Sequence, residues 1–209
     1  MNRRNYAREL ERLIARNGDA KPRLLLHACC GPCSTSVLEY LSEHFEITVF
    51  WYNPNLFPEE EFNKRLDTLK EVLEKMNLSE RVKILERPWL HEEYSAAVDG
   101  LENEPEGGTR CTACFRLRLT ETARIAKEQK FDYFCTTLSV SRHKDAVLIN
   151  AIGESAASEA GTIWLPSDFK KRNGENRSAE LSEELGIYRQ LYCGCEYSLA
   201  NRERKKDAV

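Results

Sequence analysis

The cysteines are the residues of this 209-residue sequence whose type and spacing could do chemistry. Seven of the eight fall in three tight groups, Cys29-Cys30-x-x-Cys33, Cys111-x-x-Cys114 and Cys193-x-Cys195. Cysteines that serve only as small apolar side chains would be scattered along the core periodicity. The grouping therefore indicates metal binding or redox chemistry. The eighth, Cys135, stands alone in the apolar stretch YFCTTL, where we expect a buried core residue.

The first two groups suit a shared metal centre. We expect Cys111 and Cys114 to open a helix, where residues three apart share one face and free backbone amides favour thiolates. Cys29 and Cys30 end a buried strand, so both can face one site only if the Gly-Pro that follows turns the chain away. Four thiolates suit zinc or an iron–sulfur cluster. A structural zinc site usually uses two C-x-x-C pairs, so the doublet and the surplus cysteines favour redox chemistry.

The third group, Cys193-Gly194-Cys195, is of a different kind. A disulfide between cysteines one residue apart closes a small strained ring and would be easily reduced. Gly194 removes the side chain that would resist such a turn. The pair could store two electrons, or it could supply two ligands to a second metal.

The hydropathy pattern predicts an α/β fold that positions these groups. The expected strands are 23–30, 47–53, 82–85, 132–138 and 162–166. The expected helices are 4–17, one capped by Ser34 and running through Leu41, 58–76, 111–130, one through 146–152, and 178–186. This alternation indicates a parallel sheet with right-handed crossovers and helices on both faces. We expect a single domain over 1–209, with an N-terminal helix in 1–20, a site loop at 86–110 and a basic tail at 199–209.

In open parallel sheets, ligands bind at the carboxyl ends of the strands. The doublet ends the first predicted strand, the segment after the second strand holds polar side chains, and a polar segment also follows the fourth strand. The residues that we expect to position a substrate there are Tyr52, Asn53, Asn55, Arg142 and Lys144. His27 and Trp51 precede this edge, and we expect both to be core residues.

Charge and hydropathy exclude two broad classes. The 31 basic and 34 acidic residues give a net charge of −3, which excludes a uniformly basic nucleic-acid coat but allows local basic patches. Two basic runs are present, Lys170–Arg172 and Arg202–Lys206. No run approaches the roughly 18 apolar residues of a membrane span, and the first residues are polar. We therefore expect a cytoplasmic protein with no membrane partner.

With these residues assembled, the sequence resembles the cobalamin-independent epoxyqueuosine reductase family. The resemblance rests on five stretches within residues 24–198: LLLHACCGPCS, WYNPNLFP, RCTACFRLRL, TTLSVSRHKD and YRQLYCGCEYS. It implies a fold like that of the adenine-nucleotide alpha-hydrolase (HUP-like) group. It also implies reduction of epoxyqueuosine to queuosine at the anticodon wobble position of tRNA, with electrons from an external donor.

The resemblance further implies site residues. A [4Fe-4S] cluster would be held by Cys29, Cys30, Cys111 and Cys114, and Cys193 with Cys195 would form a redox-active disulfide. Some family members carry Asp at the position of Cys33, which suggests a neighbouring metal or thiol role for that residue. Because the reduction takes two electrons and a single cluster normally passes one, a second redox element is needed. We expect either the dithiol or a second iron near Cys33, Cys193 and Cys195.

Two other classes of protein remain open at this point. A zinc-stabilised nucleotide-binding transferase should carry a glycine-rich phosphate loop after the first strand, but only Gly31 stands there. A non-enzymatic iron–sulfur sensor or carrier would need neither the loop at 86–110 nor the polar residues that follow the second and fourth strands.

Overall fold

The computed structural model describes residues 4–207, without the side chains of residues 172 and 205–207. Its centre is a parallel sheet of four strands, which are β1 (Arg23–His27), β2 (Glu46–Trp51), β3 (Lys83–Glu86) and β4 (Tyr133–Thr136). Their order across the sheet is β3-β2-β1-β4, and Leu25 of β1 is paired with Thr48 on one side and Phe134 on the other. Apolar side chains of β1 are fully buried, as expected for a central strand that is covered on both faces. The predicted parallel α/β architecture is confirmed.

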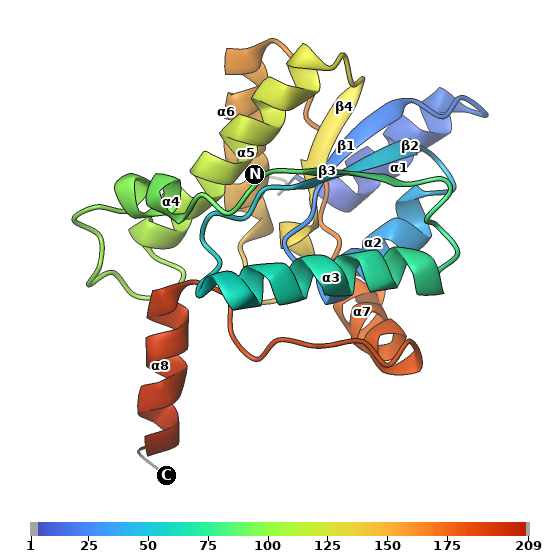
Figure 1. The fold of residues 1–209 in the computed structure, drawn as a ribbon. Helices are drawn as coiled ribbons and strands as arrows, with labels where there is room; N and C mark the ends of the chain where they lie inside the picture. Colours follow the sequence, from blue (N-terminus) through green and yellow to red (C-terminus); the bar gives the residue numbers. More distant parts are fainter. Residues whose placement is uncertain (1–3, 208–209) are drawn as a thin grey trace.

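Helices cover both faces of the sheet (Figure 1). On one face, α2 (Gly31–Leu41) packs against α3 (Glu59–Lys75) and α7 (Gly174–Glu184). On the other face, α5 (Thr109–Glu128) packs against α6 (Ala146–Ala160). The chain runs outward from β1 to β3 and then crosses back to β4, so the strand order reverses between β1 and β4. Such a reversal opens a crevice at the carboxyl ends of the two strands.

The N-terminal helix α1 (Tyr6–Asn17) lies close to its predicted position. The Asn5 side chain caps it by accepting a hydrogen bond of 3.2 Å from the Arg8 amide. Leu10 and Leu13 of α1 are buried in the core. None of the helices within residues 4–207 is both long and apolar enough to cross a bilayer.

The start of α2 differs from the prediction. The helix begins at Gly31 with Cys30 as its N-cap, so Ser34 is not the cap. Pro32 fits the first turn because its missing N–H would have no helical partner there. The Cys30 sulfur accepts from the Cys33 amide at 3.3 Å, and the Ser34 hydroxyl instead donates to the Cys30 carbonyl. As a result, Cys33 belongs to the first turn of α2.

Gly31 itself is explained by packing. A Cβ at this position would lie 2.8 Å from the methyl group of Thr68 in α3 and 3.0 Å from its carbonyl oxygen. The glycine therefore allows α2 and α3 to approach closely. No phosphate is needed to account for it.

Three further segments differ from the prediction. The predicted strand at 162–166 forms only a bridge between Trp164 and Phe134, because the Ser167 amide, which would continue the ladder, donates instead to the Asn150 side chain at 3.0 Å. The predicted loop at 86–110 contains α4 (His91–Ala97), which is too short to show a helical period. The predicted tail lies largely in α8 (Glu196–Asp207). Short 3-10 helices, η1 (Thr137–Val140) and η2 (Lys171–Asn173), follow β4 and precede α7.

Candidate thiol-lined active site

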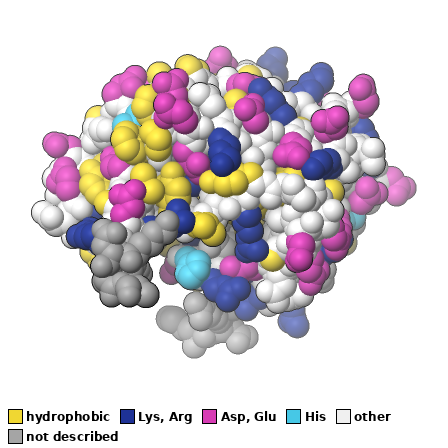
Figure 2. Space-filling view, turned by 60° about the horizontal axis from the view of Figure 1, so that its bottom comes forward, with side chains coloured by type: hydrophobic (Ala, Val, Ile, Leu, Met, Phe, Trp, Pro, Cys, Tyr) yellow, Lys and Arg dark blue, Asp and Glu magenta, His cyan; other side chains and the backbone are white. Residues whose placement is uncertain are grey.

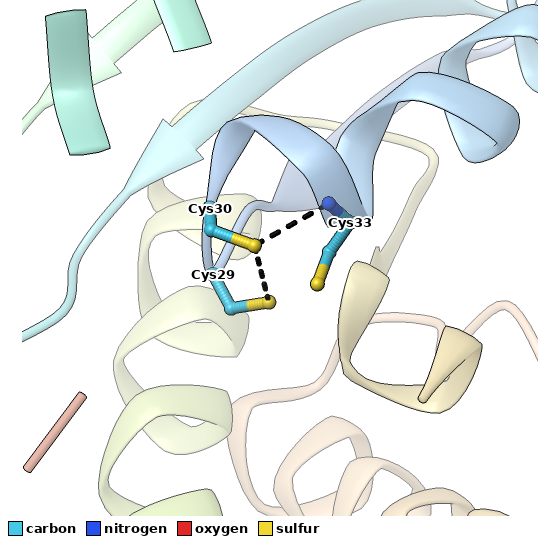
Figure 3. A group of neighbouring side chains, drawn as sticks. All are labelled: Cys29, Cys30 and Cys33. Atoms are coloured by element: carbon cyan, nitrogen blue, oxygen red, sulfur yellow. Dashed lines mark hydrogen bonds between the residues drawn. The ribbon is translucent and has the colours of Figure 1, made fainter. Parts of the chain in front are cut away.

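Three cysteines meet where β1 leads into α2. The sulfur atoms of Cys29, Cys30 and Cys33 all lie within 4.8 Å of one another, and those of Cys29 and Cys30 are 3.9 Å apart (Figure 3). Strand β1 ends at His27, so the chain has left the sheet before the doublet. Both thiols of the doublet can therefore face one point, as the sequence predicted. Among the described residues, this is the one group of three or more potential metal-ligating side chains this close together.

Polar groups from other segments contact this trio. The Gln190 side-chain amide donates to the Cys30 sulfur at 3.0 Å, and the Thr137 hydroxyl donates to the Cys29 sulfur at 3.3 Å. Hydrogen bonds to sulfur stabilise a thiolate and tune any metal that it binds. The side-chain oxygen of Gln190, Oε1, is buried without a hydrogen-bond partner among the described residues.

The three thiols differ in how readily they ionise. Hydrogen bonds with Cys30 and Cys33 lower the pKa of Cys29 well below its ordinary value. Burial raises the pKa of Cys30 to about 12, and hydrogen bonding to Cys29 raises the pKa of Cys33 as well. One thiolate therefore forms easily and suppresses ionisation of its neighbours. A metal that bound all three sulfurs would have to displace the remaining protons.

A cavity of about 1210 Å³ opens over the trio and brings in the other cysteine groups. Its walls include the side chains of Cys29, Cys30, Cys33, Cys111 and Cys193. These five residues come from three segments that are distant in sequence but meet at the carboxyl edge of the sheet. The convergence predicted from strand order is therefore present in the structure.

Cys111 and Cys114 lie in the first two turns of α5. Cys111 lines the cavity and accepts a hydrogen bond of 3.2 Å from the Gly107 amide, whereas Cys114 is buried behind the wall. Burial raises the pKa of Cys111 and raises that of Cys114 to about 12. Burial thus outweighs the effect of the helix N-terminus, which we expected to favour the thiolates. Neither sulfur belongs to the close trio.

The Cys193-Gly194-Cys195 loop divides its two thiols between two environments. Cys193 lines the cavity, whereas Cys195 packs with Tyr94, Val98 and Cys114 in a small apolar cluster. All eight cysteines are free thiols in the structure. The cavity-facing thiol is therefore the more accessible member of the pair.

Arg65 of α3 holds this loop in place. Its side chain is 1% exposed and donates to the carbonyl oxygens of Cys193 at 2.9 Å and Tyr192 at 3.3 Å. Glu61 pairs with Arg65 at 2.7 Å. Gly194 has φ +130°, and a Cβ there would lie 2.8 Å from the Arg65 guanidinium. The glycine thus meets both a backbone requirement and a close contact.

Positive charge surrounds the thiols. Arg118 is buried in α5 and donates to the carbonyl oxygen of Cys114 at 3.3 Å, while Lys144 lines the cavity. Neither has a carboxylate within ion-pair distance among the described side chains. Burial opposes the charge on Lys144, but electrostatic attraction to the Cys193 and Cys29 sulfurs outweighs it and raises the pKa of Lys144. Arg118 is buried and Lys144 is partly buried, and such charges are costly without partners. These cations therefore favour an anionic occupant of the cavity.

The predicted substrate-positioning residues occupy two regions. Lys144 lines the thiol cavity, and Arg142 lines a neighbouring cavity, where it pairs with Glu175 at 2.9 Å. The other three, Tyr52, Asn53 and Asn55, are buried and line neither of these two cavities.

Two of these buried residues make defined contacts. The Tyr52 hydroxyl donates to Glu93 of α4, and the Asn53 amide donates to the Ala28 carbonyl at 2.8 Å. Asn53 also accepts from Arg118 at 3.4 Å. These contacts fix the backbone on either side of the β1 and β2 ends.

His27 and Cys135 are core residues, as expected. His27 is fully buried, and its Nε2–H donates to the Tyr52 carbonyl while Nδ1 accepts from the Thr136 hydroxyl at 2.7 Å. Burial lowers the pKa of His27 to about 3, so the imidazole is neutral. Cys135 is fully buried in β4, and burial raises its pKa.

The type and spacing of several residues at the site do not mark them as functional. Arg65 follows helical spacing like an ordinary surface charge. Arg118 lies within RCTACFRLRL and Gln190 within YRQLYCGCEYS, but neither is singled out there as a contact of the thiols. Residues of α8 also line the cavity, namely Ser198, Asn201 and Arg202. Only the tertiary fold brings these groups to the thiols.

The donor set of the cavity fits an iron–sulfur or zinc centre. Soft thiol ligands from three segments, N–H donors aimed at sulfur, and unpaired cations beside the thiols all suit an anionic thiolate-bound metal. A parallel α/β fold with such a cavity at the switch point is that of a redox or metal-dependent enzyme.

Comparison with known proteins identifies the family. The family model described as epoxyqueuosine reductase QueH matches residues 24–201. The chain is 42% identical to the epoxyqueuosine reductase QueH of Streptococcus pyogenes serotype M1, over 93% of this chain and 78% of that protein. It is 39% identical to the Staphylococcus epidermidis protein of the same name, over 93% and 84%, and 33% identical to that of Thermotoga maritima, over 87% and 93%. The chain belongs to the epoxyqueuosine reductase QueH family of oxidoreductases.

Proposed function

We propose that this protein reduces epoxyqueuosine to queuosine at the wobble position of tRNA, using electrons from an external donor. The observation that carries the proposal is the meeting of five thiols from three segments in one cavity of a chain that belongs to this family. The reaction breaks both carbon–oxygen bonds of the epoxide, consumes two electrons and two protons, and leaves an alkene and water. The site must therefore supply electrons, protons and a place for the nucleoside.

We assign a [4Fe-4S] cluster to Cys29, Cys30, Cys111 and Cys114. When bound, such a cluster supplies electrons one at a time. Cys29 and Cys30 at the end of β1, and Cys111 across the cavity, support the assignment. Cys114 lies one turn further along α5. Gln190 and Thr137 would donate hydrogen bonds to the ligand sulfurs and so adjust the potential of the centre.

We assign the second redox element to Cys193 and Cys195. Two thiols that form a disulfide release two electrons and two protons, which is the amount that the epoxide reduction consumes. The Cys193 position on the cavity wall supports its role as the thiol nearest the substrate. The alternative role for this pair is to hold a second iron together with Cys33, which already lies on the same cavity.

Lys144 is the substrate-binding candidate that fits this cavity most directly. It can donate to the polar substituents of a nucleoside or to a phosphate. Tyr52, Asn53 and Asn55 are buried, so we propose that they act on the substrate through the segments that they hold in place. Arg142 lies further out and would contact the tRNA beyond the modified nucleoside.

We also infer one domain over 1–209 with the arrangement of the adenine-nucleotide alpha-hydrolase group. The strand order β3-β2-β1-β4 and the continuation of the sheet edge at Trp164 support this inference. Free thiols persist in a reducing cytoplasm, where we place the protein. The close packing of Gly31 on Thr68 weakens the alternative of a phosphate loop and hence of a nucleotide-binding transferase.

The test of this proposal is a comparison of two cysteine variants purified without oxygen. Cys111→Ala should lose iron, acid-labile sulfide and turnover of epoxyqueuosine-containing tRNA, because it removes a proposed ligand. Cys135→Ala removes an equally sized thiol from the core and should keep all three. Stoichiometric zinc without sulfide in the unmodified protein would contradict the cluster, and would favour the zinc-stabilised alternative.

A further inference from the structure

A second cavity, of about 480 Å³, adjoins the thiol cavity. Basic side chains from separate parts of the chain line it, namely Arg4, Arg142, Lys144, Lys170 and Lys171. Lys144 and Asp145 line both cavities, so the two are contiguous at this point. A ligand that entered the thiol cavity could therefore extend into the second one.

Ion pairs occupy three of these five cations. Arg4 pairs with Glu9 at 2.7 Å and with Glu154 at 2.9 Å, Arg142 pairs with Glu175 at 2.9 Å, and Lys170 pairs with Asp168 at 3.2 Å. Asp145 is the N-cap of α6 and accepts from the Val147 amide at 2.8 Å. Lys171 is exposed and, like Lys144, has no carboxylate within ion-pair distance among the described side chains. Two lysines without an ion-pair partner therefore line this cavity and can bind an anion.

The lining of the cavity favours a phosphate. In Figure 2, Lys and Arg side chains lie next to a histidine in the lower middle of the face, and acidic side chains lie close by and over the rest of the face. A concave site with converging ammonium and guanidinium groups suits a phosphate, which Lys contacts as a point charge and Arg as a fork. The tyrosine ring of Tyr6 and the exposed Val147 side chain provide an apolar wall beside it.

We propose that the second cavity binds the phosphate of a nucleotide that flanks the modified nucleoside in the tRNA. The inference rests on the proposed function, because the flanking position is set by a nucleoside in the thiol cavity. Arg142, Lys170 and Lys171 hold the backbone while Lys144, at the junction, holds the link between the two nucleotides. The N-terminal segment contributes Arg4, which no motif in the sequence marks as part of a site.

The test measures tRNA binding against salt concentration with Lys171→Gln. The salt slope is the slope of the logarithm of the binding constant against the logarithm of the salt concentration. Loss of one phosphate contact should lower the magnitude of this slope by about 0.7, which corresponds to roughly fivefold weaker binding at 0.1 M salt. Lys171→Arg should restore the slope. Lys21→Gln is the matched control, because Lys21 is exposed at the opposite end of β1. Iron and sulfide should be unchanged in all three variants.

A neutral methylphosphonate placed beside the wobble nucleotide of an anticodon stem-loop then locates the contact. The methylphosphonate should weaken binding of the stem-loop to the unmodified protein and should have little further effect on its binding to Lys171→Gln. Equal slopes for Lys171→Gln and the unmodified protein would overturn the inference. A second result would also overturn it, namely a salt slope for tRNA binding that is unchanged in Lys171→Gln together with slower reduction of that variant by an acidic electron-carrier protein. That result would assign the cavity to the electron carrier. Turnover of tRNA by the unmodified protein tests the proposed function separately, because the slope is measured without turnover.

Discussion

The Arg65 guanidinium donates a hydrogen bond of 2.9 Å to the carbonyl oxygen of Cys193. This contact links the buried face of α3 to the loop that holds Cys193 and Cys195. The same guanidinium lies 5.0 Å from the centre of the Tyr192 ring, and Glu61 holds it from the other side. The position of the cavity-facing thiol is therefore set by a buried ion pair and not by the loop alone.

Replacement of Arg65 by Lys should separate positioning from charge. An ammonium keeps the charge but cannot reach both carbonyl oxygens as a planar fork can. We expect turnover to fall about tenfold or more, and Cys193 to be alkylated faster in the peptide-resolved reaction with iodoacetamide, while iron and sulfide remain. Arg124→Lys is the control, because Arg124 is exposed on α5 and pairs with Glu121 and Glu128. Unchanged turnover and alkylation would show that Arg65 does not position the loop.

Gly194→Ala should destabilise the protein through two effects. A positive φ costs a residue with a side chain about 1–2 kcal/mol, and forcing a Cβ to 2.4 Å from Leu56 adds about 1–3 kcal/mol. At roughly 2–4 °C per kcal/mol, the melting temperature should fall by about 4–20 °C. Gly186→Ala is the control, because Gly186 also has a positive φ, of +58°, but a Cβ there meets nothing within 4 Å. A fall no larger than that of Gly186→Ala would mean that the loop moves to accept the methyl group.

The parallel sheet, the positions of most helices and the convergence of the cysteines could be predicted from the sequence. They follow from hydropathy periods and from the rule that sites lie at the carboxyl ends of strands, both of which are local or topological. The start of α2 was missed because a cysteine acts as its cap, and α4 was missed because Tyr94 is its one buried residue.

The surroundings of the thiols could not be predicted in the same way. Arg65 lies 128 residues from Cys193 and Gln190 lies 160 residues from Cys30, so neither contact leaves a trace in local spacing. The split of the Cys193 and Cys195 environments depends on how α4 and α5 pack. Such contacts are set by tertiary packing, which periodicity does not encode.

Replacement of either Cys193 or Cys195 by Ser should affect turnover and spare the cluster. Each substitution prevents formation of the disulfide and so removes both electrons that the proposed dithiol supplies. Turnover should therefore fall by orders of magnitude with most iron and sulfide retained. Metal analysis and a tRNA reduction assay on the same preparations check this expectation. Activity that survives both substitutions would exclude a relay or an essential metal role, and loss of the cluster would make the substituted residue a ligand.

Gln190→Leu should lower the reduction potential of the centre. The substitution keeps much of the side-chain volume but removes the N–H that donates to the Cys30 sulfur at 3.0 Å. A hydrogen bond to a ligand sulfur stabilises the more negative reduced state, so its loss favours the oxidised state. Potentiometric titration should show a more negative midpoint, whereas Gln129→Leu, at an exposed glutamine after α5, should leave the midpoint unchanged. A midpoint equal to that of the unmodified protein would contradict this role of Gln190.

The proposed reduction is tested most directly by mass analysis of the nucleosides released from epoxyqueuosine-containing tRNA after anaerobic incubation with the reduced protein. We expect epoxyqueuosine to disappear and a product lighter by one oxygen atom, with the mass of queuosine, to appear in proportion to the cluster content of the preparation. Unchanged epoxyqueuosine with a fully loaded, reduced protein would contradict it.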